Sequence, residues 1–349
     1  MITTILIPLL VGLALFLFGM KLMESALHLL AGPYLHLWLG RFTQTPLRGM
    51  VTGTALTALL QSSTAITVIA IGLVNAGVLS FPRTLGIILG TNIGTCLTTE
   101  LIGLSIGGFA LPLLLAAAGA WLASWLAQPR QRPALPAEQP QRGASGAPQH
   151  AVPAPAEAVP GWLRSVRFGS LAIAGFALVL LGIEIMQSIG PALQSRGLFT
   201  WFVHQAQQSL LWGVLAGAAI TALVHSSSAV IAMAMGLAAA QSIPVELGVA
   251  IVIGANVGTC VTAVIAGLGG SRAGSYVAWF HVLLNVGGAL LFYPFIHQLA
   301  LISSMLAGEE ASQIARAQTI FNVLSSLLAL PLCYLIRTRT FKPVHNSNP

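Results

Sequence analysis

The sequence predicts an all-α polytopic membrane protein built from two inverted-topology repeats. Of its 349 residues, 56% are hydrophobic and only 7% are charged, whereas soluble domains carry roughly 25% charged residues. Residues 53–96 recur as 217–260, with 18 identities in 44 positions and no gap. Internal repeats with interrupted apolar segments are typical of transporters whose site lies at the repeat interface.

The apolar stretches that could enter or cross a bilayer lie near residues 3–31, 49–79, 84–128, 168–194, 209–240, 247–268, 276–302 and 314–336. One span needs roughly 20 residues, so the longer stretches must bend, pair or turn back. The first stretch follows no basic segment and has no small-residue cleavage site. We therefore expect a first membrane helix there and not a removed signal peptide.

A polar cluster interrupts the second stretch, and an equivalent cluster interrupts the fifth. The clusters are Gln61, Ser62, Ser63 and Thr64 in the first repeat and His225, Ser226, Ser227 and Ser228 in the second. We expect a re-entrant hairpin or broken helix at each, because irregular backbone at membrane depth survives only where it lines a cavity or is buried. A helix restarting at these hydroxyls would present free N–H groups to an anion. A single Ser-Ser pair could instead bond its own helix carbonyls.

A second doubled motif, G-T-N-I-G-T-C and G-A-N-V-G-T-C, follows each cluster at the same spacing. Its amide and hydroxyl oxygens suit a small, hard cation. The candidate cation ligands are Thr91, Asn92, Thr95, Asn256 and Thr259.

The linker and the charges that flank it indicate how the chain divides into repeats and how it is oriented in the membrane. Residues 129–161 contain eight prolines and little to bury, which predicts a disordered linker. We expect a first membrane repeat over 1–128, a second over 162–302, and an additional transmembrane helix with a short basic tail over 303–349. The first helices also match, 17–25 on 180–188. Arginines in and after the linker and basic residues in the tail place both on the cytoplasmic side of a multi-pass inner membrane protein.

Several functional classes are disfavoured. The net charge of +7 comes from scattered residues, which argues against nucleic-acid binding. Cys96, Cys260 and Cys333 lack metal-ligand spacing, so we expect buried thiols, no metal beyond sodium and no cofactor. No carboxylate pair or Ser/His/Asp arrangement indicates an enzyme.

Few charges fall inside the apolar stretches, where each is a functional candidate. Glu24, Glu100 and Glu184 are the acids there, and aspartate is absent from the chain. Glu100 could tune cation binding or face an aqueous vestibule. Lys21 and Glu184 occupy matched positions and could simply snorkel at helix ends.

The doubled pairing of Q-S-S-[ST] with G-[TA]-N-[IV]-G-T resembles the type II sodium/phosphate cotransporter family, including its bacterial members. The resemblance implies sodium-coupled phosphate symport by alternating access. It implies that the serine clusters help form the phosphate and sodium sites, with Ser62 and Ser226 in both, although His225 departs from the glutamine usual there. Family members also resemble residues 278–285 and 315–322, two segments that share a pattern in which His281 is matched by Gln318. For His281 and Asn285 we expect packing against the hairpin, ahead of ligand contact.

Alternatives within transport are another oxyanion or a proton-coupled exporter, and outside transport a phosphate sensor that moves nothing. Bacterial relatives often append a domain resembling the regulatory protein PhoU. The chain ends soon after its last apolar stretch, so we expect that domain to be absent and a separate PhoU-like regulator to be a candidate partner. A homo-oligomer is a further expectation.

Overall fold

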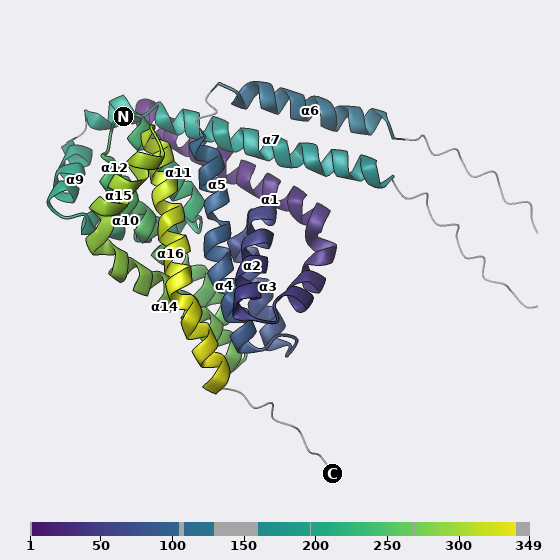
Figure 1. Cartoon of the computed structure of the whole chain (residues 1–349). Coiled ribbons are helices and arrows are strands. Elements are labelled where there is room, and N and C mark those ends of the chain that lie inside the picture. The colour runs from purple at the N-terminus through teal and green to yellow at the C-terminus, as the bar shows by residue number, and fades with distance from the viewer. Residues whose placement is uncertain (1, 105–107, 129–159, 196, 269, 340–349) are drawn as a thin grey trace, which may run out of the picture.

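The computed structural model describes residues 2–104, 108–128, 160–195, 197–268 and 270–339, and all the regular structure in these ranges is helical (Figure 1). The elements of the first half are η1 (Ile2–Leu6), α1 (Ile7–Phe42), α2 (Pro46–Leu60), α3 (Ser63–Asn75), α4 (Phe81–Gly94), α5 (Cys96–Gly103) and α6 (Ala110–Leu126). Those of the second half are α7 (Gly161–Gln187), α8 (Gly190–Gln194), α9 (Gly197–Gln208), α10 (Leu211–Val224), α11 (Ser227–Ala239), α12 (Val245–Gly258), α13 (Cys260–Gly267), α14 (Arg272–Phe292), η2 (Tyr293–Phe295), α15 (Ile296–Leu306) and α16 (Glu310–Arg339).

The corresponding first helices of the two repeats, α1 and α7, pack antiparallel through glycines. A β-carbon added at Gly12 would lie 2.7 Å from the Gly182 carbonyl oxygen, and one at Gly19 would lie 2.6 Å from that of Gly175. At the offset of 163, Gly12 corresponds to Gly175 and Gly19 to Gly182. Gly12 therefore contacts the counterpart of Gly19, and Gly19 contacts the counterpart of Gly12. This two-fold arrangement is what an inverted repeat produces, and small residues allow the close approach.

Within each repeat the same helix pair interlocks in the same register. A β-carbon on Gly90 of α4 would lie 2.1 Å from the Met50 carbonyl oxygen of α2. The equivalent atom on Gly254 of α12 would lie 1.9 Å from the Val214 carbonyl oxygen of α10. At the offset of 164, Met50 corresponds to Val214 and Gly90 to Gly254. The same contact therefore occurs in both repeats, and the packing is duplicated along with the sequence.

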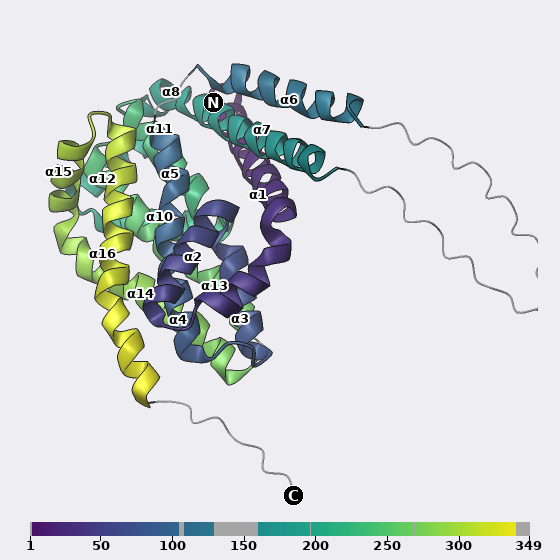
Figure 2. The same ribbon diagram turned by 45° about the vertical axis from the view of Figure 1, so that its right-hand side comes forward.

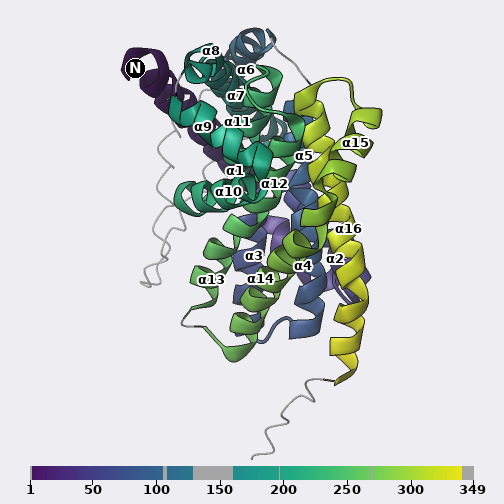
Figure 3. The same cartoon turned by 90° about the vertical axis from the view of Figure 1, so that its left-hand side faces the viewer.

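Helices α14 and α16 occupy comparable places on the two repeats. Helix α14 packs on α12 and α13 and crosses to α3, whereas α16 packs on α4 and α5 and crosses to α11. The Cys260 thiol lies 3.9 Å from the His281 carbonyl oxygen, and the Cys96 thiol lies 3.9 Å from that of Gln318. Helix α16 is thus the counterpart of α14, and it also packs along α15 (Figure 3).

Six helical segments among the described residues are long and apolar enough to cross a membrane: 3–31, 81–103, 161–194, 245–267, 272–306 and 310–336. The stretches 49–79 and 209–240 are each two short helices, α2 with α3 and α10 with α11. The predicted class, an all-α polytopic membrane protein with broken helices at the polar clusters, is confirmed.

The expected stretch 84–128 is divided into two parts. Helices α4 and α5 follow one another and end with α5 at Gly103, and α6 begins at Ala110. Helix α6 lies along α7 (Figures 1 and 2). The Arg167 guanidinium of α7 donates to the Ser124 carbonyl oxygen at 3.3 Å and stacks over the Trp125 ring at 4.0 Å. The predicted linker lies outside the described residues except at its end, where α7 already begins at Gly161.

Candidate functional site

Both polar clusters are helix breaks with the same backbone geometry. Gln61 and His225 end α2 and α10 in the left-handed region, with φ of 55° and 56°. The next residues, Ser62 and Ser226, are extended, and each side-chain oxygen accepts a hydrogen bond at 3.3 Å from the backbone N–H three residues on. These serines are therefore N-caps, and α3 and α11 begin directly after them with further N–H groups unpaired.

The two breaks share one cavity. A vestibule of about 700 Å³ is lined by Gln61–Thr64 from the first repeat and His225–Ser228 from the second. The structure thus brings all eight predicted cluster residues together from positions more than 160 residues apart. Two helix N-termini, each with its hydroxyls, face the same space.

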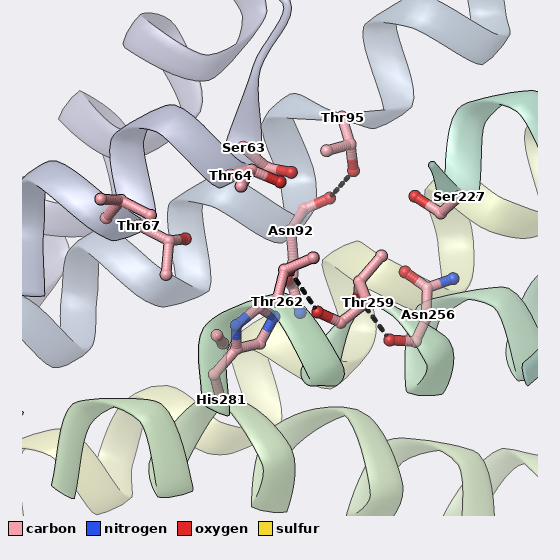
Figure 4. Close-up of a pocket in the computed structure, with 12 residues that line it drawn as sticks. Ser63, Thr64, Thr67, Asn92, Thr95, Ser227, Asn256, Thr259, Thr262 and His281 are labelled. Atoms are coloured by element: carbon pink, nitrogen blue, oxygen red, sulfur yellow. Dashed lines mark hydrogen bonds between the residues drawn. The ribbon is translucent and has the colours of Figure 1, made fainter. Parts of the chain in front are cut away.

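A small polar cavity of about 20 Å³, which we call the inner cavity, is drawn in Figure 4. It shares part of its wall with the vestibule. This volume is about that of one water molecule or small ion. The predicted residues that line the inner cavity are Ser63, Thr64, Asn92 and Thr95 from the first repeat and Ser227, Asn256 and Thr259 from the second. The predicted anion and cation residues are therefore neighbours.

Hydrogen bonds orient the asparagines so that their side-chain oxygens stay available. The Asn92 amide nitrogen donates to the Asn285 side-chain oxygen at 3.0 Å, and the Asn256 amide nitrogen donates to the Val252 carbonyl at 2.8 Å. The Thr95 and Thr259 hydroxyls donate to the asparagine backbone carbonyls at 2.7 and 2.6 Å, and each keeps oxygen lone pairs free. Neutral oxygen ligands of this kind suit a hard cation.

The hydroxyls of Ser63 and Ser227 differ from those of the capping serines. Neither makes a hydrogen bond to another side chain or carbonyl in the described part of the chain, and both line the two cavities. The alternative, that all the serines bond their own helix carbonyls, does not describe these two residues.

Two predicted residues have other contacts. Thr91 lines neither cavity, because its buried hydroxyl donates to the Ile88 carbonyl in its own helix at 2.8 Å. Gln61 lines the vestibule, but its amide donates to the Ala58 carbonyl and accepts from the Thr98 hydroxyl at 2.6 Å. Gln61 therefore stabilises the helix end.

Glu100 forms an ion pair that the sequence did not predict. Its carboxylate pairs with the Arg316 guanidinium of α16 and accepts a hydrogen bond from the Thr319 hydroxyl at 2.6 Å. Glu100 lines neither cavity. Its partner lies 216 residues away in sequence, so spacing could not reveal this ion pair between α5 and α16.

Three polar residues of the inner cavity were not predicted as site residues. Thr67, Thr262 and His281 line this cavity, and the Thr67 hydroxyl and the His281 Nδ1 are buried without a hydrogen-bond partner among the described residues. For His281, packing against the hairpin was expected ahead of ligand contact. The signals available were that Thr67 follows Ser63 by one helical turn and that Thr262 is the repeat counterpart of Thr98.

The fold and site together define a class of protein: a membrane protein of two inverted repeats whose broken helices converge on one polar cavity, which is the architecture of a secondary transporter. The profile of the Na+/Pi-cotransporter family matches residues 15–134 and 178–325. The chain belongs to this family, and the predicted resemblance is confirmed.

Curated relatives agree with this assignment. The chain is 31% identical over 320 residues to "Uncharacterized protein YqeW" of Bacillus subtilis, covering 92% of each. It is 25% identical over 327 residues to "Putative inorganic phosphate export protein YjbB" of Escherichia coli, covering 93% of this chain and 53% of that protein, so it spans about half the length of the second relative. Mouse "Sodium-dependent phosphate transport protein 2A" is 30% identical over 135 residues, covering 36% of this chain and 21% of that protein. No solved structure matches.

Proposed function

We propose that this chain is a secondary transporter that couples inorganic phosphate to sodium by alternating access. The observation that carries the proposal is the convergence of two serine-capped helix starts, one from each inverted repeat, on one vestibule. Family membership supports phosphate as the substrate. No covalent chemistry is involved.

Phosphate binds where the starts of α3 and α11 face each other. Helix N-termini attract anions through unpaired N–H groups and the positive end of the macrodipole. The free hydroxyls of Ser63 and Ser227 add donors, and Thr64 and Ser228 line the same wall.

Sodium binds in the adjoining inner cavity. The oriented amide oxygens of Asn92 and Asn256 and the hydroxyl oxygens of Thr95 and Thr259 supply neutral ligands. Ser62 and Ser226, which the sequence also suggested as cation ligands, line the vestibule and not the inner cavity, where they act as N-caps. A cation beside an anion lowers the cost of bringing either out of water, which couples their binding.

The vestibule wall differs between the two repeats, which supports alternating access. Leu17 and Met20 of α1 line it. Their counterparts in α7, Leu180 and Ile183, do not line it. Because the repeats are related by a two-fold arrangement, the opposite state would open beside α7.

We also propose the inner membrane as the location, with the linker and the C-terminal tail cytoplasmic, from the basic residues 130, 132, 164, 167, 337 and 339. A homo-oligomer and a separate PhoU-like regulator remain predictions.

A second candidate is phosphate export with a different coupling ion, and one relative supports the export part because its name specifies phosphate export. The same cavity would serve, since neutral oxygens do not fix the direction of net transport.

The test is uptake of labelled phosphate into proteoliposomes with a sodium, potassium or pH gradient imposed in turn. The proposal expects uptake driven by the sodium gradient. Equal uptake under all three gradients would contradict sodium coupling, uptake driven by pH alone would favour the second candidate, and binding without uptake would indicate a sensor.

A further inference from the structure

The vestibule wall beside α1 carries an ion pair that the phosphate and sodium sites do not use. Among the described residues lining the vestibule, Lys21 and Glu24 are the formally charged ones. The Lys21 ammonium lies 3.2 Å from a Glu24 carboxylate oxygen, and the side chains are 74% and 21% exposed. Lys21 lies well inside α1, so the expectation that it snorkels at a helix end is wrong.

This ion pair is weak enough to exchange. Exposed pairs one helical turn apart gain little, because water screens them and both side chains lose freedom. An ammonium has three donors and a carboxylate accepts only. Lys21 is therefore free to bind another anion, and Glu24 another cation, at little cost.

The charges are confined to one side of the transport path. The α7 counterparts of Lys21 and Glu24 are Glu184 and Gln187, and neither lines the vestibule. The Glu184 carboxylate instead accepts a hydrogen bond from the Gly108 backbone N–H at 3.1 Å. Among the described residues that line the vestibule, an oxyanion therefore meets an ammonium on the α1 wall and none from α7.

We propose that Lys21 and Glu24 form an exchangeable ion pair that loads the vestibule. Arriving phosphate displaces the Glu24 carboxylate from the Lys21 ammonium, and the released carboxylate receives the sodium ion that enters with it. The vestibule then takes up an anion and a cation together more readily than either alone, and each raises the affinity for the other by the same factor. This proposal rests on the proposed function.

The test is phosphate binding by purified protein at low and at high sodium. Lys21→Gln should weaken phosphate binding roughly tenfold by removing a charged donor, and Lys21→Arg should restore most of it. Glu24→Gln should strengthen phosphate binding at low sodium, because the competing carboxylate is gone, and should flatten the sodium dependence. Glu184→Gln is the matched control and should leave both measurements unchanged.

The outcomes separate the two proposals. If wild-type protein binds phosphate with sodium dependence and Glu24→Gln keeps that dependence in full, the ion-pair proposal is overturned and the transporter proposal stands. If wild-type protein binds no phosphate, both fail. Since Glu24→Gln and Lys21→Arg change the side-chain volume little, they decide the matter even if Lys21→Gln folds poorly.

Discussion

The adjacent serines in each cluster have different roles. Ser62 and Ser226 cap helices, and losing such a cap costs about 1 kcal/mol of stability. Ser63 and Ser227 stand one residue further on, and their hydroxyls line the cavities with no hydrogen-bond partner among the described residues. The first pair therefore builds the backbone geometry, and we assign the second pair to the ligand.

Replacing Ser63 or Ser227 with alanine should weaken phosphate binding about tenfold to hundredfold. Each change removes a hydrogen bond to a charged group, worth roughly 1.5–3 kcal/mol. Equilibrium binding of labelled phosphate to the purified variants measures the effect.

The matched controls are Thr57→Val and Thr221→Val. These repeat-related hydroxyls are buried, have no hydrogen-bond partner within the described ranges, and line neither cavity. Valine keeps their shape, so phosphate affinity should stay at the wild-type value. Equal losses in all four variants would count against a serine-built phosphate site.

The sequence predicted the site residues that recur in both repeats. It did not predict the residues that only tertiary packing brings to the cavities. Ser63, Asn92 and their counterparts could be found because rare polar residues recur in register. His281 reaches the inner cavity only because α14 packs on α13 and crosses to α3. Lys21 was visible in the repeated first helix, but its position on the vestibule wall depends on how α1 crosses the bundle.

The helix pairs α2 with α4 and α10 with α12 are held at glycine contacts that leave no room for a side chain. In each pair the two main chains are in direct contact. This contact fixes the positions of the helix breaks, and therefore of the starts of α3 and α11. The positions of the serines therefore depend on these contacts.

Gly90→Ala and Gly254→Ala should each lower stability by about 1–3 kcal/mol, since the new methyl group would overlap a carbonyl oxygen of the neighbouring helix. Thermal unfolding in detergent measures the change. Gly72→Ala is the control, because nothing lies within 4 Å of its added carbon and alanine is favoured over glycine inside a helix by roughly 0.5–1 kcal/mol. A loss for Gly72→Ala as large as that for Gly90→Ala would contradict this account.

The helix breaks could be predicted from the sequence, whereas the contacts between helices distant in sequence could not. A polar cluster in an apolar stretch too long for one span requires a break, wherever the rest of the chain lies. The ion pair of Glu100 with Arg316 depends on α16 packing against α5. No local pattern encodes that meeting.

The orientation of the whole molecule predicts how an introduced cysteine reacts. Cys96, Cys260 and Cys333 are all buried, so background labelling should be low. In intact cells Ala144→Cys should react with a membrane-permeant thiol reagent and resist an impermeant one, because the linker is predicted to be cytoplasmic. Ready labelling by the impermeant reagent would reverse the orientation.

The duplication and the inverted arrangement could be predicted from sequence and charge, whereas the full extent of the symmetry could not. Residues 303–349 were expected to form an additional helix with a tail, yet α16 packs on the first repeat much as α14 packs on the second. The shared pattern around His281 and Gln318 is short, and only the packing shows that it marks equivalent helices.

The central claim is that the two serine clusters form one phosphate site. The most direct test is the stoichiometry of phosphate binding, measured by titration calorimetry at saturating sodium for the wild type, Ser63→Ala and Ser227→Ala. The account predicts one phosphate per chain in the wild type and weaker binding at that single site in both variants. Two phosphates per chain in the wild type, with each variant keeping one site of unchanged affinity, would contradict it.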